Sequence, residues 1–292
     1  MISRIRQYFS SSAGTARRLE AGPLGSVGII AGNGPFPIRF AREAKAAGHT
    51  VLAVCHEGET DPAIENEVDR VVWVKVGELG RLISAFKDAG VKRIAMAGGI
   101  GRVNRFGDIK LDARGARLML KLRTTKDDVV MRGIASELER EGIVVEPCTL
   151  FLKDCLVPEG ALTRRTPNEA QWSDIHAGAA ALHAMSAHDI GQLVVVKQGV
   201  IVAVEAVEGS DAAIRRGGEL GGADTVVVKI PKPTQDMRFD VPTIGKRTIE
   251  TMQAVGARVL AVEAGSTLMM DGPAVVELAE REGIIIVGFK SA

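Results

Sequence analysis

The sequence is poor in aromatic residues and cysteine, and its five histidines follow no metal-binding pattern. Aromatic side chains make up only 4% of the 292 residues, which argues against the stacking platforms that bind single-stranded nucleic acid. The 37 lysines and arginines are balanced by 36 acids, so we expect no nucleic-acid partner. The three cysteines, Cys55, Cys148 and Cys155, lack metal-ligand spacing. We therefore expect reduced thiols that pack as small core residues in a cytoplasmic protein.

Long apolar runs and a serine-hydrolase signature are also absent. No stretch has the continuous apolar core of a signal peptide or the length of a membrane span, and no G-x-S-x-G elbow occurs. The first 24 residues stand apart, because they contain four arginines and no acid before Glu20. We expect residues 1–24 to form a basic, disordered leader. The alternative is that this leader contacts an anionic membrane surface.

The sequence does contain a regular alternation of apolar strands with amphipathic helices, beginning at Ser26. Such alternation predicts βαβ units and a parallel sheet. The second half differs, because residues 192–206 read as a β-hairpin that turns at Gln198 and Gly199. The predicted fold class is therefore α/β, with a Rossmann-like parallel-sheet amino-terminal domain and a second, mixed α/β domain. We place these domains at residues 25–157 and 175–292, with a polar linker over 158–174.

Two glycine turns follow predicted strands of the first domain. The turn Gly32-Asn33-Gly34 invites a dinucleotide interpretation, since glycines there let backbone amides approach a pyrophosphate. However, Pro37 stands where the fingerprint requires glycine or alanine, and Glu57 is a weak candidate for its acid. We therefore expect no nicotinamide, and favour a plain turn or another phosphate ligand.

The second glycine turn, Gly98-Gly99, ends the fourth predicted strand. Open α/β sheets place ligands at this edge, so the pair could line a cleft. Close packing of the strand against a helix is the alternative, and both interpretations stay open.

A charged segment follows the apolar run 225–228. It contains Lys229, Lys232 and Arg238 together with Asp236 and Asp240. Cations and carboxylates between a strand end and a helix start suit a phosphate and its divalent metal. The alternative is a surface loop whose charges pair with one another.

Three prolines, Pro231, Pro233 and Pro242, stiffen this segment because each fixes φ and removes a donor. Thr243 follows the last of them and is a candidate N-cap for the helix that residues 245–255 predict.

A second acidic turn leaves the predicted hairpin with Glu205, Glu208 and Asp211. If the strand continued, alternation would place Glu205 and Glu208 on opposite faces, so one of them would be solvated or paired. Glu208 and Asp211 bracket a Gly-Ser turn and could reach one Mg²⁺ or Mn²⁺ ion. Arg215 and Arg216 would contact phosphate, or would simply neutralise the acidic turn.

These segments together resemble one family, the metal-dependent UDP-2,3-diacylglucosamine pyrophosphatases of lipid A biosynthesis. The resemblance spans about Val27 to Phe289 and is carried by VEAVEGSD (204–211), KIPKPTQDMRFDVPTIG (229–245), IIAGNGPFP (29–37), AGGIGR (97–102) and KDD (126–128). It implies two domains with the lipid substrate between them, and hydrolysis to UMP and a diacylglucosamine 1-phosphate with Mg²⁺ or Mn²⁺. Ser210 departs from the threonine expected there, which keeps the hydroxyl.

The residue pattern and the resemblance together give the expected site. Asp236, Lys229 and Arg238 are the predicted catalytic residues, and the predicted metal ligands are Asp236, Asp240, Glu208 and Asp211. The predicted substrate-binding residues are Gly32, Asn33, Gly34, Gly98, Gly99, Gln192, Lys232, Gln235, Thr243 and Gly245.

The expected location is cytoplasmic, peripheral to the inner membrane, with UDP-2,3-diacylglucosamine as substrate and a homodimer left open. Two other functions are considered, a nucleotide-sugar oxidoreductase and a non-catalytic nucleotide-binding sensor.

Overall fold

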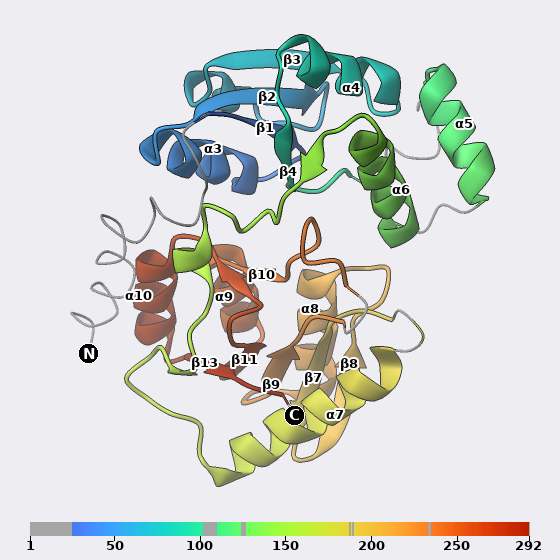
Figure 1. Cartoon of the computed structure of the whole chain (residues 1–292). Helices are drawn as coiled ribbons and strands as arrows, with labels where there is room; N and C mark the ends of the chain where they lie inside the picture. The colour runs from blue at the N-terminus through green and yellow to red at the C-terminus, as the bar shows by residue number, and fades with distance from the viewer. Residues whose placement is uncertain are drawn as a thin grey trace. The chain divides into compact units, whose positions relative to one another are not determined.

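A computed structural model describes residues 25–101, 110–123, 127–186, 188, 190–232 and 235–291. The predicted leader, residues 1–24, lies outside the described residues. The chain divides into two compact units (Figure 1). The N-terminal unit contains described residues up to Lys153 together with the segment Asp236–Asp240, and the C-terminal unit contains Asp154–Gln235 and the residues from Val241 onward.

The N-terminal unit is built on a five-stranded parallel sheet in the order β3-β2-β1-β4-β5. Its strands are β1 (Ser26–Ala31), β2 (Thr50–His56), β3 (Arg70–Val74), β4 (Arg93–Ala97) and β5 (Val144–Val145). The chain switches direction between β1 and β4, which is where open α/β sheets bind ligands. The predicted Rossmann-like domain is confirmed.

The helices of this unit are α3 (Phe36–Ala46), α4 (Leu79–Asp88), α5 (Ala113–Leu122) and α6 (Asp127–Arg140), with a 3₁₀ turn at Pro62–Asn66. Their apolar stripes bury Phe40, Phe86 and Leu138 completely, as the 3.6-residue period requires. Helix α5 was not expected from the sequence.

The C-terminal unit has a six-stranded mixed sheet in the order β6-β13-β11-β9-β7-β8. Its strands are β6 (Gly160–Ala161), β7 (Leu193–Lys197), β8 (Val200–Val204), β9 (Val226–Lys229), β11 (Val259–Glu263) and β13 (Ile285–Phe289). A parallel pair, β10 (Thr243–Ile244) with β12 (Leu268–Met269), lies apart from this sheet.

The predicted hairpin is confirmed, because β7 and β8 pair antiparallel. Gln198 and Gly199 have φ values of 51° and 79°. Two successive positive φ angles are the signature of the tight turn that matches strand twist.

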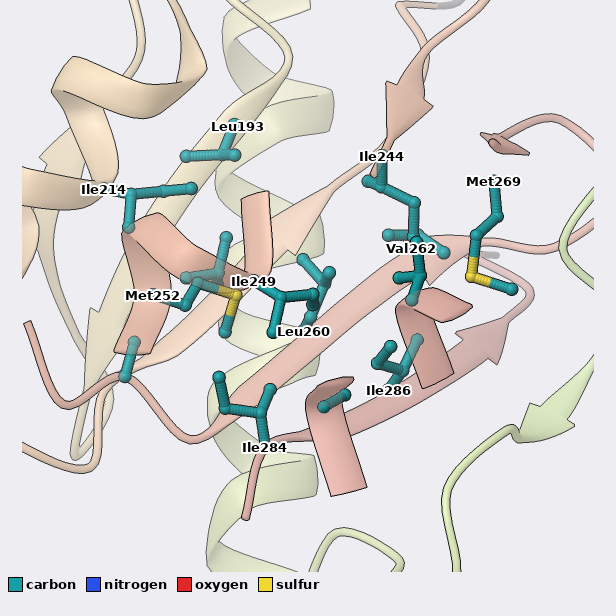
Figure 2. Packing of buried hydrophobic residues seen from close by; sticks show 14 of the residues in the cluster. Leu193, Ile214, Ile244, Ile249, Met252, Leu260, Val262, Met269, Ile284 and Ile286 are labelled. Carbon is teal, nitrogen blue, oxygen red and sulfur yellow. The ribbon is translucent and has the colours of Figure 1, made fainter. Parts of the chain in front are cut away.

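Helices cover both faces of this sheet. Helix α7 (Glu169–Ser186) packs on one face, and α8 (Ser210–Gly221), α9 (Lys246–Ala254) and α10 (Gly272–Glu282) pack on the other. Figure 2 shows the core between the sheet and helices α8, α9 and α10. There Ile249 and Met252 of α9 meet Leu260 of β11 and Ile284, which precedes β13. No helix among the described residues is both long and apolar enough to cross a bilayer.

Glycines allow two of these helices to approach the sheet closely. A Cβ atom at Gly178 of α7 would lie 2.6 Å from Val228, and one at Gly217 of α8 would lie 2.5 Å from Val195. Both spacings are far below van der Waals contact, so any larger residue would push the helix away from the sheet.

The structure differs from the predicted domain limits in two places. Residues 158–174 are not a plain linker, because Gly160–Ala161 pairs with β13 and α7 begins at Glu169. The segment Asp236–Asp240 belongs to the N-terminal unit, although the chain on either side of it belongs to the C-terminal unit.

Candidate active site

A polar cavity of about 370 Å³ opens in the C-terminal unit. Strand β9 delivers Lys229 to it, and helices α8 and α9 direct their amino-terminal ends at it. The lining residues are Glu208, Gly209, Ser210, Asp211, Ala212, Arg215, Lys229, Thr243, Arg247 and Thr248. Because helix amino termini and cations both favour negative charge, this cavity suits an anion such as phosphate.

Lys229 is the buried cation of this cavity, with only 6% of the residue exposed. Its Nζ donates to Ser210 Oγ at 3.2 Å and to the Thr243 carbonyl at 3.0 Å. The ammonium is therefore fixed at the end of β9, between the acidic turn and β10. A fixed cation can stabilise charge without first reorganising.

Glu205 holds the Ser210 hydroxyl in place through a hydrogen bond. Strand β8 ends at Val204, and the buried Glu205 accepts hydrogen bonds from Ser210 Oγ at 2.9 Å and from the Gln192 amide at 3.2 Å. Neither Glu205 nor Ser210 is among the site residues predicted from the sequence. The available signal was the spacing: an acid at the strand end and a hydroxyl at the first residue of the next helix.

The two predicted metal ligands in this turn are held by arginines. Glu208 accepts from Arg216 at 2.6 Å, and Asp211 accepts from Arg247 at 2.6 Å. Hydrogen bonds from its own backbone amide and from Arg216 lower the pKa of Glu208. The alternative that Arg216 neutralises the acidic turn is thus confirmed for Glu208.

Arg215 adds a second cation to the cavity lining. Among the described residues no acid forms a salt bridge with its guanidinium. Arg215 can therefore contact an incoming phosphate without first breaking an ion pair inside the described part of the chain.

Two predicted substrate-binding glutamines meet each other. Gln235 Nε2 donates to Gln192 Oε1 at 3.3 Å, and Gln235 Oε1 accepts from the Lys232 amide at 2.9 Å. Both amide side chains are part-buried and oriented by the protein, and the structure thus brings together residues 43 positions apart.

The predicted N-cap at Thr243 is wrong. Thr243 lies in β10, while Gly245 is the N-cap of α9 and donates its amide to Thr248 Oγ1 at 3.4 Å. The reason is the short pairing of Thr243 with Leu268, which delays the helix until Lys246.

The predicted catalytic residues Asp236 and Arg238 do meet, within the N-terminal unit. Arg238 donates to both carboxylate oxygens of Asp236, from Nε to Oδ1 at 3.0 Å and from Nη2 to Oδ2 at 2.8 Å. Arg238 also donates to Glu139 of α6 at 2.7 Å. These hydrogen bonds from Arg238 are the main reason that the pKa of Asp236 lies below its usual value.

The backbone of this segment is anchored in the same unit. The Cys148 amide donates to the Arg238 carbonyl at 2.8 Å, and Phe239 packs against the N-terminal core. All three cysteines are buried and free, as predicted, and burial raises the pKa of the Cys148 thiol to about 12. Asp240 is exposed at the end of the segment.

The described residues contain no cluster of three or more histidine, cysteine or acidic side chains that could hold a metal ion. Asp236, Glu208 and Asp211 are instead each bound by an arginine. The arrangement does not fit a preformed metal centre. Their role as metal ligands stays a prediction.

The predicted glycine turn of the N-terminal unit makes a close backbone crossing. The Gly32 amide donates to the Ala97 carbonyl at 2.8 Å, and the Asn33 amide donates to the Gly99 carbonyl at 2.7 Å. A Cβ atom at Gly32 would lie 2.3 Å from the Gly99 oxygen, and one at Gly98 would lie 2.4 Å from the Asn33 oxygen. These glycines are therefore explained by packing of one turn on the other, and the two amides are already used.

An acid that the sequence did not point to sits at this switch point. Glu59 accepts from Asn33 Nδ2 at 3.2 Å and from the Gly101 amide at 2.8 Å. For the candidate acid Glu57, the structure gives a hydrogen bond from its backbone amide to the Val74 carbonyl. Gly34 has a φ of 83° and open space around its Cα.

Comparisons with known proteins place a domain boundary close to the one between the two units, at residues 155–158. A family model described as the LpxI N-terminal domain matches residues 26–155, and one described as the LpxI C-terminal domain matches residues 158–287. The UDP-2,3-diacylglucosamine pyrophosphatase LpxI of Caulobacter vibrioides is 32% identical over 273 residues, which cover 90% of this chain and 96% of that protein.

Solved structures give only weak likenesses. The biotin carboxylase subunit of a pyruvate carboxylase is 14% identical with a TM-score of 0.27, over 59% of this chain and 35% of that chain. Rhizobium etli pyruvate carboxylase is 14% identical with a TM-score of 0.28, over 70% of this chain and 18% of that chain. These values carry no argument about function. The two domain models and the Caulobacter relative, by contrast, cover nearly the whole described chain, and the chain belongs to the LpxI family.

Proposed function

We propose that this chain hydrolyses the diphosphate of UDP-2,3-diacylglucosamine to UMP and 2,3-diacylglucosamine 1-phosphate, a step of lipid A biosynthesis. Membership of the LpxI family supports the reaction, since the Caulobacter relative is named for it. The observation that carries the proposal is the buried Lys229 ammonium at a cavity with two helix amino termini. A diphosphate is the ligand that such a cavity would stabilise best.

The reaction adds water to one phosphorus and breaks the bridging P–O bond. Negative charge grows on the phosphoryl oxygens and on the departing phosphate, and a proton is released to solvent. Lys229 and Arg215 would neutralise that charge, and the fixed position of Lys229 makes its contribution larger than that of a mobile cation. Ser210, held between Glu205 and Lys229, would orient a phosphate oxygen or the attacking water.

The roles of Asp236 and Arg238 are part of the same proposal. Arg238 would meet phosphoryl oxygens, and Asp236 would hold the Arg238 guanidinium in position or accept a metal ion in its place. The family resemblance implies Mg²⁺ or Mn²⁺, although Asp236, Glu208 and Asp211 are each bound by an arginine. This metal dependence stays a prediction from the family resemblance, as do the peripheral membrane location and the homodimer.

The test is turnover of UDP-2,3-diacylglucosamine by the purified chain, with UMP and the lipid monophosphate identified by mass spectrometry. Lys229→Met should abolish most of the release of UMP. A matched control is Lys197→Met, which removes a cation from the opposite end of the neighbouring strand β7. Equal activity of the two variants would contradict the assignment of the cavity.

The same assay separates the alternative functions. A nucleotide-sugar oxidoreductase would change the absorbance of NAD(P)H in the presence of UDP-sugars. A sensor would bind the substrate without releasing UMP. Either result in a chain that releases no UMP would overturn the proposal.

A further inference from the structure

An exposed apolar surface lies on helix α5 and the residues next to it in the N-terminal unit. Leu120 is 77% exposed and Leu111 is 42% exposed. Together with Ala116, Met119 and Arg123 they line a shallow hollow of about 750 Å³. A single exposed leucine is common on protein surfaces and does not indicate a binding site. A contiguous exposed apolar surface, by contrast, marks an interaction site.

The orientation of α5 is fixed by contacts on its other face. Leu118 is buried in the N-terminal core. Asp112 caps the helix by accepting the Gly115 amide at 2.8 Å, and it also accepts the Gly80 amide of α4 at 2.6 Å. Arg114 pairs with Glu137 of α6. The helix therefore cannot roll to hide Leu120.

Cations border the apolar surface. Lys110, Arg117, Lys121 and Arg123 are all exposed. Within the part of the chain that the structure describes, no acid forms a salt bridge with Arg117, Lys121 or Arg123. The only acid of residues 110–123 is Asp112, whose carboxylate is committed to backbone amides. Within the described residues the surface is thus an apolar stripe of leucine and methionine bordered by exposed cations that no described acid pairs.

We propose that this face of α5 docks on an anionic lipid bilayer, with Leu120 entering the interface and the surrounding cations meeting lipid phosphates. A basic helix with one apolar face is the arrangement that binds a membrane surface in plane. Long lysine and arginine side chains can keep their charges at headgroup level while their stems follow the leucine. A protein partner is the alternative, and the chain would then not bind vesicles through α5.

The inference rests on the proposed function for its purpose only, since a lipid substrate is presented at a membrane. Bilayer binding is a property of the chain without substrate, so it can be measured separately from hydrolysis. Failure of one measurement therefore does not imply failure of the other.

The experiment is co-sedimentation of the full chain with vesicles of phosphatidylethanolamine and phosphatidylglycerol, without substrate. Leu120→Asp should lower the partition coefficient by about tenfold or more. The substitution replaces an apolar side chain that would enter the bilayer with a negative charge that faces anionic lipid. Lys121→Glu should also lower vesicle binding, and this loss should be larger at lower salt concentration. The matched control is Leu220→Asp on α8, where the leucine is 67% exposed but belongs to the other unit.

Four outcomes decide the question once unchanged melting temperatures show that the variants are folded. Loss of vesicle binding in Leu120→Asp and Lys121→Glu, but not in Leu220→Asp, with unchanged turnover of detergent-dispersed substrate, supports the proposal. Unchanged vesicle binding in both α5 variants overturns it, as does binding that disappears only when residues 1–24 are deleted. A loss of turnover on detergent-dispersed substrate in Leu120→Asp would also overturn it, because α5 would then hold substrate rather than bilayer.

Discussion

The ammonium of Lys229 lies 3.2 Å from the hydroxyl oxygen of Ser210, which in turn lies 2.9 Å from Glu205. A buried cation and a buried carboxylate are thereby joined through one hydroxyl. Removing either charge would break this hydrogen-bonded chain in a buried environment, which is costly. Because this chain of groups ends at the polar cavity, it should affect turnover more strongly than an exposed ion pair of the same unit.

Lys229→Met should lower turnover by about two to three orders of magnitude, the usual cost of losing one preorganised charge-stabilising group. Lys229→Arg keeps the charge but not the shape, so its activity should lie between those of the wild type and the methionine variant. Steady-state kinetics with UDP-2,3-diacylglucosamine gives the comparison. A methionine variant that matches Lys197→Met in kcat would show that the cavity is not the reaction site.

Ser210→Ala and Ser210→Thr distinguish the contribution of the hydroxyl to activity from that of packing at the start of α8. Alanine removes the hydrogen bonds to Lys229 and Glu205, and kcat should fall by about tenfold to a hundredfold. Threonine keeps the hydroxyl and should stay within a few-fold of the wild type. If both variants lose activity equally, packing at the start of α8 matters rather than the hydroxyl.

Asp236→Ala should lower turnover by about two to four orders of magnitude if Asp236 acts in catalysis, and Asp236→Asn should be nearly as inactive. The structure adds a control, since Glu139→Gln removes the other carboxylate partner of Arg238 without touching Asp236. Glu139→Gln should keep most activity. Turnover of Asp236→Ala within about threefold of wild type, less than ~0.7 kcal/mol, would make the predicted catalytic role wrong.

The Asp236–Arg238 pair also predicts a pH dependence of stability. The folded pKa of Asp236 is lowered from 3.8, so the pair stabilises the fold fully above the unfolded pKa and loses that contribution as pH falls through the folded pKa. The difference in unfolding free energy between the wild type and Asp236→Asn should therefore be constant from neutral pH to about pH 5 and shrink below about pH 4. Urea denaturation across this range measures it. A difference that is independent of pH would show that the carboxylate keeps its ordinary pKa.

The predicted metal dependence has a direct test. Hydrolysis should stop in EDTA and return with Mg²⁺ or Mn²⁺, because the oxygen-only ligands implied by the resemblance favour these hard ions. The arginine pairing of Asp236, Glu208 and Asp211 makes this test informative. Full activity in metal-free buffer would mean that lysine and arginine side chains alone neutralise the diphosphate.

Local patterns were enough to predict much of the fold. Apolar runs such as Thr50–His56 reveal buried strands by composition alone, and Gln198-Gly199 encodes a tight hairpin because glycine adopts positive φ without cost. Helices α5 and α7 were missed. Helix α7 is apolar around much of its circumference, so it lacks the one-sided pattern that periodicity detects. Helix α5 does have a one-sided apolar pattern, but Gly115 near its start weakens the local helix signal.

The sequence by itself determined which residues could do chemistry, because acids and cations next to strand ends are visible as local clusters. It placed Lys229, Glu208, Asp211 and Asp236 in one list. Only the tertiary structure decided their partners, since ion pairs such as Arg238 with Glu139, 99 residues apart, depend on how the chain packs and not on spacing.

The tertiary structure likewise assigned Asp236–Asp240 to the N-terminal unit and Lys229 to the C-terminal unit. Asp236 lies only seven positions after Lys229 in the sequence, yet the Cys148 amide and the N-terminal core hold the segment that begins at Asp236. The physical reason is that burial of Phe239 and satisfaction of backbone groups are long-range terms, which no local pattern records.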